Sequence, residues 1–138
     1  MGLIVLDAGV LIAFLDAADT HHAPAREALA AASAAGDSLA LAASAYAEVL
    51  VGPSRRGDAE VEQLRAFVGR FPVRVVPLNE AIAEAAAVLR ARHGSRLRLP
   101  DALVIATAVV LDADVILTTD RRWPSRSALG LPARIVHV

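Results

Sequence analysis

The chain has 138 residues, a formal net charge of −1 and no cysteine. Its length is that of one domain, and the missing cysteines exclude disulfides, thiolate metal sites and cysteine nucleophiles. All fourteen basic residues are arginines, so the absence of lysine also excludes a P-loop phosphate site and Schiff-base chemistry.

The first half of the chain predicts two strands, each followed by helices. Leu3–Leu6 is a short, continuous apolar run, which is typical of a strand buried on both faces. After it we expect helices over Gly9–Leu15 and Ala23–Ala34, a strand over Ser38–Ala42, a helix from a Ser44 cap to about Val51, and a loop over Gly52–Gly57.

The second half continues this alternation. We expect a helix from an Asp58 cap to about Phe71, a strand over Val73–Val76, and a helix from an Asn79 cap to about Arg92. An arginine-rich loop over His93–Leu99 then leads to a helix from Pro100 to about Asp112 and a strand over Val115–Thr118. The chain should end with an irregular stretch over Arg121–Gly130, which contains one helical turn, and a strand over Arg134–Val138. The pattern predicts a single α/β domain over residues 1–138, with a central parallel sheet of about five strands flanked by helices on both faces.

No segment suits a membrane span or a secretion signal. The longest apolar run, Ala102–Leu111, lies between Asp101 and Asp112, and it is shorter than the roughly 20 residues that a spanning helix needs. The first residues lack the basic region of a signal peptide, and Asp7 interrupts their apolar stretch. We therefore expect a cytoplasmic protein without a membrane contact.

Four acidic residues are predicted to meet at one edge of the sheet. Asp7 directly follows the first strand, Asp120 follows the fourth, and Glu48 lies in the helix after the second. The helix that begins at Pro100 leads back to the start of the fourth strand, so Asp101 in its first turn begins at the same edge. In open parallel sheets, ligands bind beyond the carboxyl ends of the strands.

Carboxylates that converge in this way favour a bound divalent cation. Like charges held close together cannot all stay ionised unaided, and a cation removes that cost. Oxygen ligands without cysteine suit Mg²⁺ or Mn²⁺, which can activate water and neutralise a phosphodiester. Each acid also has an ordinary explanation: Asp7 as a helix cap, Asp101 as a helix-dipole residue, Asp120 as a turn residue and Glu48 as a solvated side chain.

At these residues the sequence resembles the PIN-domain family and, within it, the VapC toxins of bacterial toxin–antitoxin pairs. The matching stretches are Leu6–Ala13, Ala47–Val49, Leu99–Ala108 and Val115–Asp120. The resemblance implies an endoribonuclease that uses Mg²⁺ or Mn²⁺. It implies that Asp7, Glu48, Asp101 and Asp120 hold the metal and its attacking water, and that the Thr118 hydroxyl orients a ligand or a water.

The sequence departs from the family pattern after the first aspartate. The family commonly has Ser or Thr and then Ser or Asn there, whereas this chain has Ala8 and Gly9. A hydroxyl beside the site is therefore missing, which bears on metal affinity more than on the fold. Trp123 stands where the family often has an aromatic residue.

Arginines flank two of the four acids. Arg96 and Arg98 precede Asp101, and Arg121, Arg122 and Arg126 follow Asp120. Because the net charge gives no general attraction for nucleic acid, RNA binding requires a local basic rim of this kind. The alternative is that these arginines are ordinary solvated surface residues.

The resemblance also implies partners, namely a VapB-type antitoxin and a second copy in a homodimer. Val10, Phe14 and Leu50 could face a partner or pack in the core. Three other functions remain open: a non-catalytic binding module, an RNA-processing PIN nuclease without an antitoxin, and a phosphatase. The phosphatase class wants a second aspartate two residues after the first, where this chain has Gly9.

Overall fold

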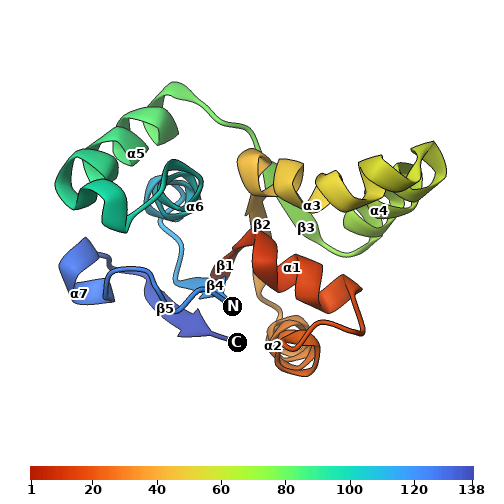
Figure 1. The fold of residues 1–138 in the computed structure, drawn as a ribbon. Coiled ribbons are helices and arrows are strands. Elements are labelled where there is room, and N and C mark those ends of the chain that lie inside the picture. Colours follow the sequence, from red (N-terminus) through yellow and green to blue (C-terminus); the bar gives the residue numbers. More distant parts are fainter.

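A five-stranded sheet forms the centre of the structure, a computed structural model that describes residues 1–138 (Figure 1). Its strands are β1 (Leu3–Leu6), β2 (Ser38–Ala42), β3 (Val73–Val76), β4 (Val115–Thr118) and β5 (Arg134–His137). They lie in the order β3-β2-β1-β4-β5, and every neighbouring pair is parallel. The predicted parallel α/β sheet is confirmed.

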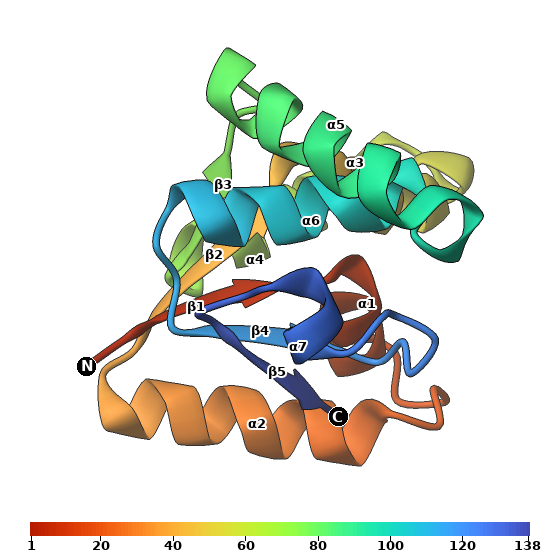
Figure 2. The ribbon, with the colours of Figure 1, turned by 90° about the vertical axis from the view of Figure 1, so that its left-hand side faces the viewer.

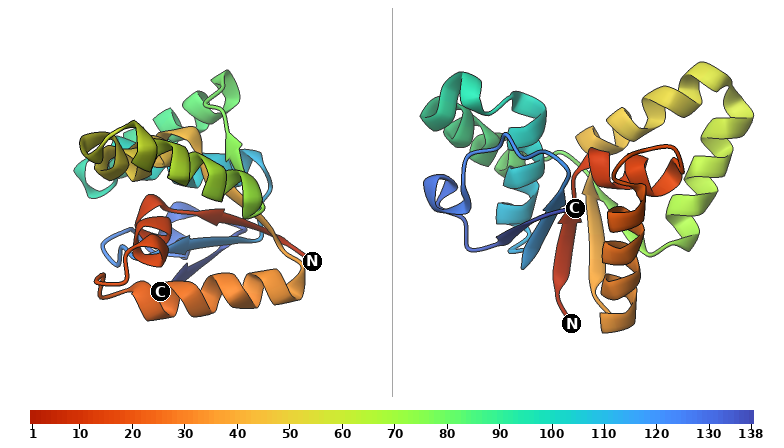
Figure 3. Two further views of the ribbon diagram at one scale, coloured as in Figure 1. Left: turned by 90° about the vertical axis from the view of Figure 1, so that its right-hand side faces the viewer. Right: turned by 60° about the horizontal axis from the view of Figure 1, so that its bottom comes forward.

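Helices cover both faces of the sheet. They are α1 (Ala8–Leu15), α2 (His22–Ala35), α3 (Ala43–Arg56), α4 (Asp58–Arg70), α5 (Glu80–His93), α6 (Leu99–Val110) and α7 (Arg126–Leu129), with a 3₁₀ turn, η1 (Gly94–Arg96), before α6. Helix α6, with α5 beyond it, lies on one face, and α2 lies on the other (Figure 2). Helices α3 and α4 form a hairpin at the opposite end of the molecule from α7 (Figure 3).

The core lies where the apolar residues of β1 pack against those of the helices, including α6. Val5 and Leu6 of β1 and Ile105 of α6 are fully buried, as expected for a central strand covered on both faces. Val10 is also fully buried, and Phe14 packs against Phe67 and Phe71, with ring centroids 5.6 Å from each. Core packing, rather than a partner surface, therefore explains Val10 and Phe14.

Three predictions around α3 and α4 were wrong. Helix α3 begins at Ala43, so Ser44 lies inside its first turn and does not cap it, and Asp58 likewise lies inside α4 behind Gly57. The predicted loop over Gly52–Gly57 is mostly helical, because a proline removes only one helical hydrogen bond and the chain can continue beyond it. The helix ends only at Gly57, where φ is 130°.

The boundaries of the elements in the second half of the chain agree more closely with the prediction. The Asn79 side chain accepts a hydrogen bond from the Ile82 N–H at 2.9 Å, which confirms the predicted cap of α5. The single turn of α7 is the helical turn expected in the irregular stretch. None of the helices combines the length and the apolar character that crossing a membrane requires.

Candidate active site

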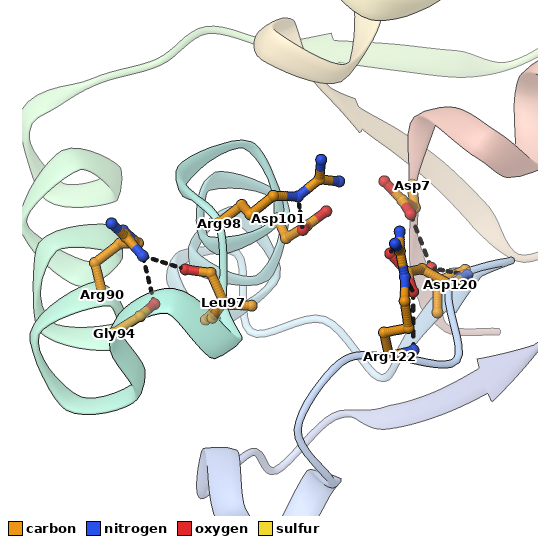
Figure 4. A network of polar contacts seen from close by, with 9 residues as sticks. Asp7, Arg90, Gly94, Leu97, Arg98, Asp101, Asp120 and Arg122 are labelled. Atoms are coloured by element: carbon orange, nitrogen blue, oxygen red, sulfur yellow. Dashed lines mark hydrogen bonds and ion pairs between the residues drawn. The ribbon is translucent and has the colours of Figure 1, made fainter.

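A polar cleft of about 420 Å³ opens at the carboxyl edge of the sheet. All four predicted acids line it. The complete lining is Asp7, Gly9, His21, Glu48, Arg98, Asp101, Thr119, Asp120, Arg121 and Arg122. No hydrophobic side chain contributes, whereas pockets for small organic ligands are mostly apolar. Figure 4 shows three of the acids, with Asp101 of α6 on one side and Asp7 and Asp120, which follow β1 and β4, on the other.

Asp7 is the most constrained of the four acids. It caps α1 directly after the buried β1, and its residue is only 9% exposed. One carboxylate oxygen accepts a hydrogen bond from the Ala8 N–H at 2.9 Å, and the other accepts one from the Thr118 hydroxyl at 2.8 Å. Burial raises the pKa of Asp7 to about 6; the two hydrogen bonds oppose this rise, and the charges of Asp101 and Glu48 add to it.

Thr118 joins the first acid to the last. Its side chain is fully buried at the end of β4, donates to Asp7 and accepts a hydrogen bond from the Asp120 N–H at 3.0 Å. A hydroxyl can donate once and accept as well, so this one residue fixes the carboxylate of Asp7 and the backbone of Asp120 together.

Asp120 lies in a contrasting electrostatic environment. Arg122 reaches its two carboxylate oxygens through Nε and Nη2, each at 3.0 Å, and the Arg122 N–H donates at 2.8 Å. This bidentate contact is the main cause that lowers the pKa of Asp120 below its usual value. Arg122 itself is 81% exposed, so it can leave the carboxylate without disturbing the core.

Asp101 and Glu48 complete the acidic set from the helices. Asp101 is in the first turn of α6 and pairs with Arg98 through Nε at 3.4 Å. Glu48 is exposed on α3; its pKa is raised by partial burial and then by the charge of Asp101, while Arg98 opposes the shift. The raised pKa places Glu48 electrostatically within reach of Asp101.

The predicted basic rim divides into three groups. Arg98, Arg121 and Arg122 line the cleft, as expected. Arg96 lies instead in an adjoining hollow of about 140 Å³. Arg126 points elsewhere: its guanidinium donates to the Leu131 and Pro132 carbonyls and so ties down the turn before β5.

The loop that carries Arg96 and Arg98 is itself held in place. Arg90 of α5 donates through Nη1 to the carbonyls of Gly94 and Leu97, the latter at 2.7 Å (Figure 4). This contact pins the η1 turn against α5, and the segment then enters α6 beside the acids.

The donor set suits a hard divalent cation in its chemistry. All the acidic groups are oxygen donors, and Asp7 has a raised pKa mainly because it is buried, with a smaller contribution from the charges of Asp101 and Glu48. As arranged here, however, no three His, Asp or Glu side chains form a ready ligand group. Two of the acids are instead engaged by Arg122 and Arg98, so a cation would have to replace those contacts.

Sequence reasoning missed three residues of the cleft, namely Gly9, His21 and Thr119. His21 bonds through Nδ1 with the Val138 carbonyl oxygen at 3.0 Å, a contact between residues 117 positions apart. Only the return of β5 to the sheet creates that contact. Thr119 had a local signal, because it stands between two predicted site residues.

Solved structures that share this fold include proteins titled as toxins or toxin–antitoxin complexes. A toxin–antitoxin complex from Klebsiella pneumoniae is 23% identical, covers 85% of this chain and 86% of that chain, and has a TM-score of 0.67. VapC20 from Mycobacterium tuberculosis, titled a sarcin-ricin loop cleaving toxin, is 21% identical, with coverages of 95% and 98% and a TM-score of 0.71. VapBC2 from Rickettsia felis is 13% identical, with coverages of 98% and 98% and a TM-score of 0.71.

A comparison with curated protein sequences gives no match. The family model of the PIN domain, by contrast, matches residues 4–128, which include β2 to β4, all of β1 except Leu3, and all four acids. With the parallel sheet and the structural likenesses, this match leads to one conclusion: the chain belongs to the PIN-domain family.

Proposed function

We propose that this protein is a metal-dependent endoribonuclease and the toxin of a toxin–antitoxin pair. The observation that carries the proposal is the convergence of four carboxylates in one wholly polar cleft, with the pKa of Asp7 raised to about 6. Four carboxylates gathered at a sheet edge, two of them buried, are costly, and their convergence is explained if the site holds a cation during its work.

Asp7, Glu48, Asp101 and Asp120 are the residues that would hold Mg²⁺ or Mn²⁺. When bound, such an ion supplies an activated water and neutralises charge on the phosphate that is cleaved. The chain's own contribution is to fix the carboxylates. Thr118 orients Asp7 by its hydrogen bond, and the same hydroxyl holds the Asp120 backbone.

The arginines at the cleft are suited to bind the RNA backbone. Arg98, Arg121 and Arg122 line it, and Arg96 lies in the adjoining hollow. Arg98 and Arg122 have mostly exposed side chains, so both can turn from a carboxylate to a phosphate. Binding through phosphates would position RNA of many sequences and would weaken as salt rises.

An antitoxin partner is supported by a second groove beside the cleft. Ile12, Leu15 and Val49 give it an apolar lining, and Glu48 belongs to both hollows. A VapB-type segment lying in this groove could place an arginine among the acids, which would block the cleft. One similar solved structure is titled a toxin–antitoxin complex and another is titled VapBC2, and we infer that this chain has an antitoxin partner, forms a homodimer and acts in the cytoplasm.

The first experiment is cleavage of a mixed cellular RNA pool by the purified protein. It is run with Mn²⁺, with Mg²⁺ and with EDTA, and Asp7→Asn is compared with wild type. Asp58→Asn, which changes an exposed acid of α4 outside the cleft, is the matched control. We expect metal-dependent cuts from wild type and the control only.

The other functions give different results in the same assay. Folded protein that binds Mn²⁺ but cuts no RNA would establish a non-catalytic binding module. Hydrolysis of a small phosphate ester without RNA cleavage would establish a phosphatase. Cleavage by a protein that has no inhibitor encoded beside it would favour an RNA-processing enzyme over a toxin.

A further inference from the structure

The two threonines at the end of β4 have different surroundings. Thr118 is fully buried, and its hydroxyl is occupied by Asp7 and by the Asp120 N–H. Thr119 lies in the bend after β4, is half-buried and lines the cleft with the four acids. The hydrogen bonds of this turn go to Thr118, which leaves the Thr119 hydroxyl available.

The space for this hydroxyl comes from Gly9 in the first turn of α1. A Cβ atom built on Gly9 would collide with the Thr119 Oγ1 atom, whereas the Thr119 Cβ lies 3.6 Å away, at ordinary contact distance. The Gly9 backbone has no positive φ that would demand glycine. The conflict is therefore with the hydroxyl itself, and the missing side chain at residue 9 is what allows the hydroxyl to sit over α1 beside Asp7.

The neighbours of Thr119 indicate what the hydroxyl would bind. The turn from Thr119 to Arg122 also brings Arg121 and Arg122 into the cleft. A hydroxyl and two guanidinium groups in one turn can together donate hydrogen bonds to an anion. Proteins contact nucleic-acid phosphates through combinations of such donors. Ionised carboxylates have no proton to donate, so the donors that a phosphate could meet in this turn are the Thr119 hydroxyl and the two guanidinium groups.

We propose that Thr119 is a substrate-binding residue whose hydroxyl donates to an RNA phosphate, and that Gly9 is required to give that hydroxyl its place. The inference rests on the proposed ribonuclease function and adds to it a residue pair on two separate elements. The pair also offers an account of the departure at residue 9: a hydroxyl absent from α1 is supplied from the bend after β4.

The test measures RNA affinity in EDTA by fluorescence anisotropy, and KM and kcat in Mn²⁺, for six variants. Thr119→Val should weaken RNA binding and raise KM by about tenfold, the loss expected for one hydrogen bond to a charged group. Thr119→Ser keeps the hydroxyl and should stay within about threefold of wild type. Thr20→Val, an exposed threonine outside the cleft, is the matched control and should change nothing.

The Gly9 variants test the steric half of the proposal. Gly9→Ala should weaken RNA binding like Thr119→Val, with little change in Tm, because the hydroxyl can rotate out of the way. In the Gly9→Ala/Thr119→Ala protein the collision is gone, so its affinity should equal that of Thr119→Ala alone. Such non-additivity is what a shared contact produces.

Three results would overturn the inference while leaving the ribonuclease in place. They are wild-type affinity and KM in Thr119→Val, an equal loss in Thr119→Ser, or additive losses for Gly9→Ala and Thr119→Ala. Wild-type protein that neither binds nor cuts RNA would be a different failure, since it overturns the proposed function and this inference together.

Discussion

Asp7 and Asp120 occupy equivalent places in the fold and have opposite electrostatics. Each follows a central strand, the two strands are paired, and the same Thr118 hydroxyl contacts both residues. Asp7 is buried and has no arginine among the groups that shift its pKa, which rises to about 6. Asp120 is held by Arg122, and its pKa falls below the usual range.

The difference shows that topology places a carboxylate but its neighbours decide its charge. On the Asp120 side an exposed arginine already compensates the acid. On the Asp7 side the compensation is incomplete, because two neutral hydrogen bonds do not offset burial and the charges of Asp101 and Glu48. The attraction for a cation should therefore be strongest at Asp7.

The largest expected effect comes from removing the Asp7 charge. Asp7→Asn should lower RNA cleavage by more than about a hundredfold, since losing even an indirect partner of a metal site costs roughly 10–100-fold.

The Asp7→Asn change should also stabilise the metal-free protein at pH 7, by at most about 3 kcal/mol for a pKa moved from 3.8 to about 6. Thermal unfolding in EDTA measures this gain, and Asp58→Asn should show neither effect. An unstable Asp7→Asn protein would contradict the charge account.

The pH dependence of stability sharpens the same contrast. The folded state holds the Asp7 proton more tightly than the unfolded chain does, so the Asp7 contribution to stability falls as pH rises from about 4 to about 6. The lowered pKa of Asp120 acts in the opposite direction, and its contribution is lost as pH falls through its folded pKa. The advantage of Asp7→Asn over wild type should therefore grow between pH 4 and pH 6. An advantage that is constant with pH would show that Asp7 is not the source.

An intermediate effect is expected at Thr118, which connects the two acids. Thr118→Val preserves the shape but leaves a part-buried N–H of Asp120 and a buried oxygen of Asp7 without their partner, at a cost of about 1–3 kcal/mol. It should also raise the Asp7 pKa further, which is measurable by NMR titration. Thr107→Val is the control, because that buried hydroxyl bonds only to the Leu103 carbonyl of its own helix. Equal losses in the two variants would remove the special role of Thr118.

The smallest effect should come from the exposed arginine. Arg122→Ala releases Asp120, so its pKa should return toward the ordinary value and Mn²⁺ should bind a few-fold more tightly. Stability should hardly change, because exposed ion pairs contribute little. Calorimetric titration with Mn²⁺ tests this, with Arg121→Ala as the matched control. Weaker Mn²⁺ binding in Arg122→Ala alone would mean that the arginine supports the site rather than competing for it.

The sequence predicted most of the fold because its signals are local. Apolar runs marked the buried strands, and the strand–helix alternation required parallel pairing. The errors were at Ser44, Asp58 and the Gly52–Gly57 segment, where residues that favour caps and turns lie inside helices. Packing against the rest of the chain overrides such weak preferences.

By itself, the sequence determined which acids meet. Asp7, Glu48, Asp101 and Asp120 line one cleft because parallel strands and a returning helix must bring their ends to one edge. Only the tertiary structure decided the burial of Asp7, its hydrogen bond from Thr118, and the meeting of Gly9 with Thr119. The physical reason is the separation of these residues along the chain. Strand–helix alternation, and ion pairs such as Arg122 with Asp120, involve residues close in sequence. Burial, the Thr118–Asp7 hydrogen bond and the steric room at Gly9 depend on residues more than a hundred positions apart; Thr118 and Asp7 are separated by 111.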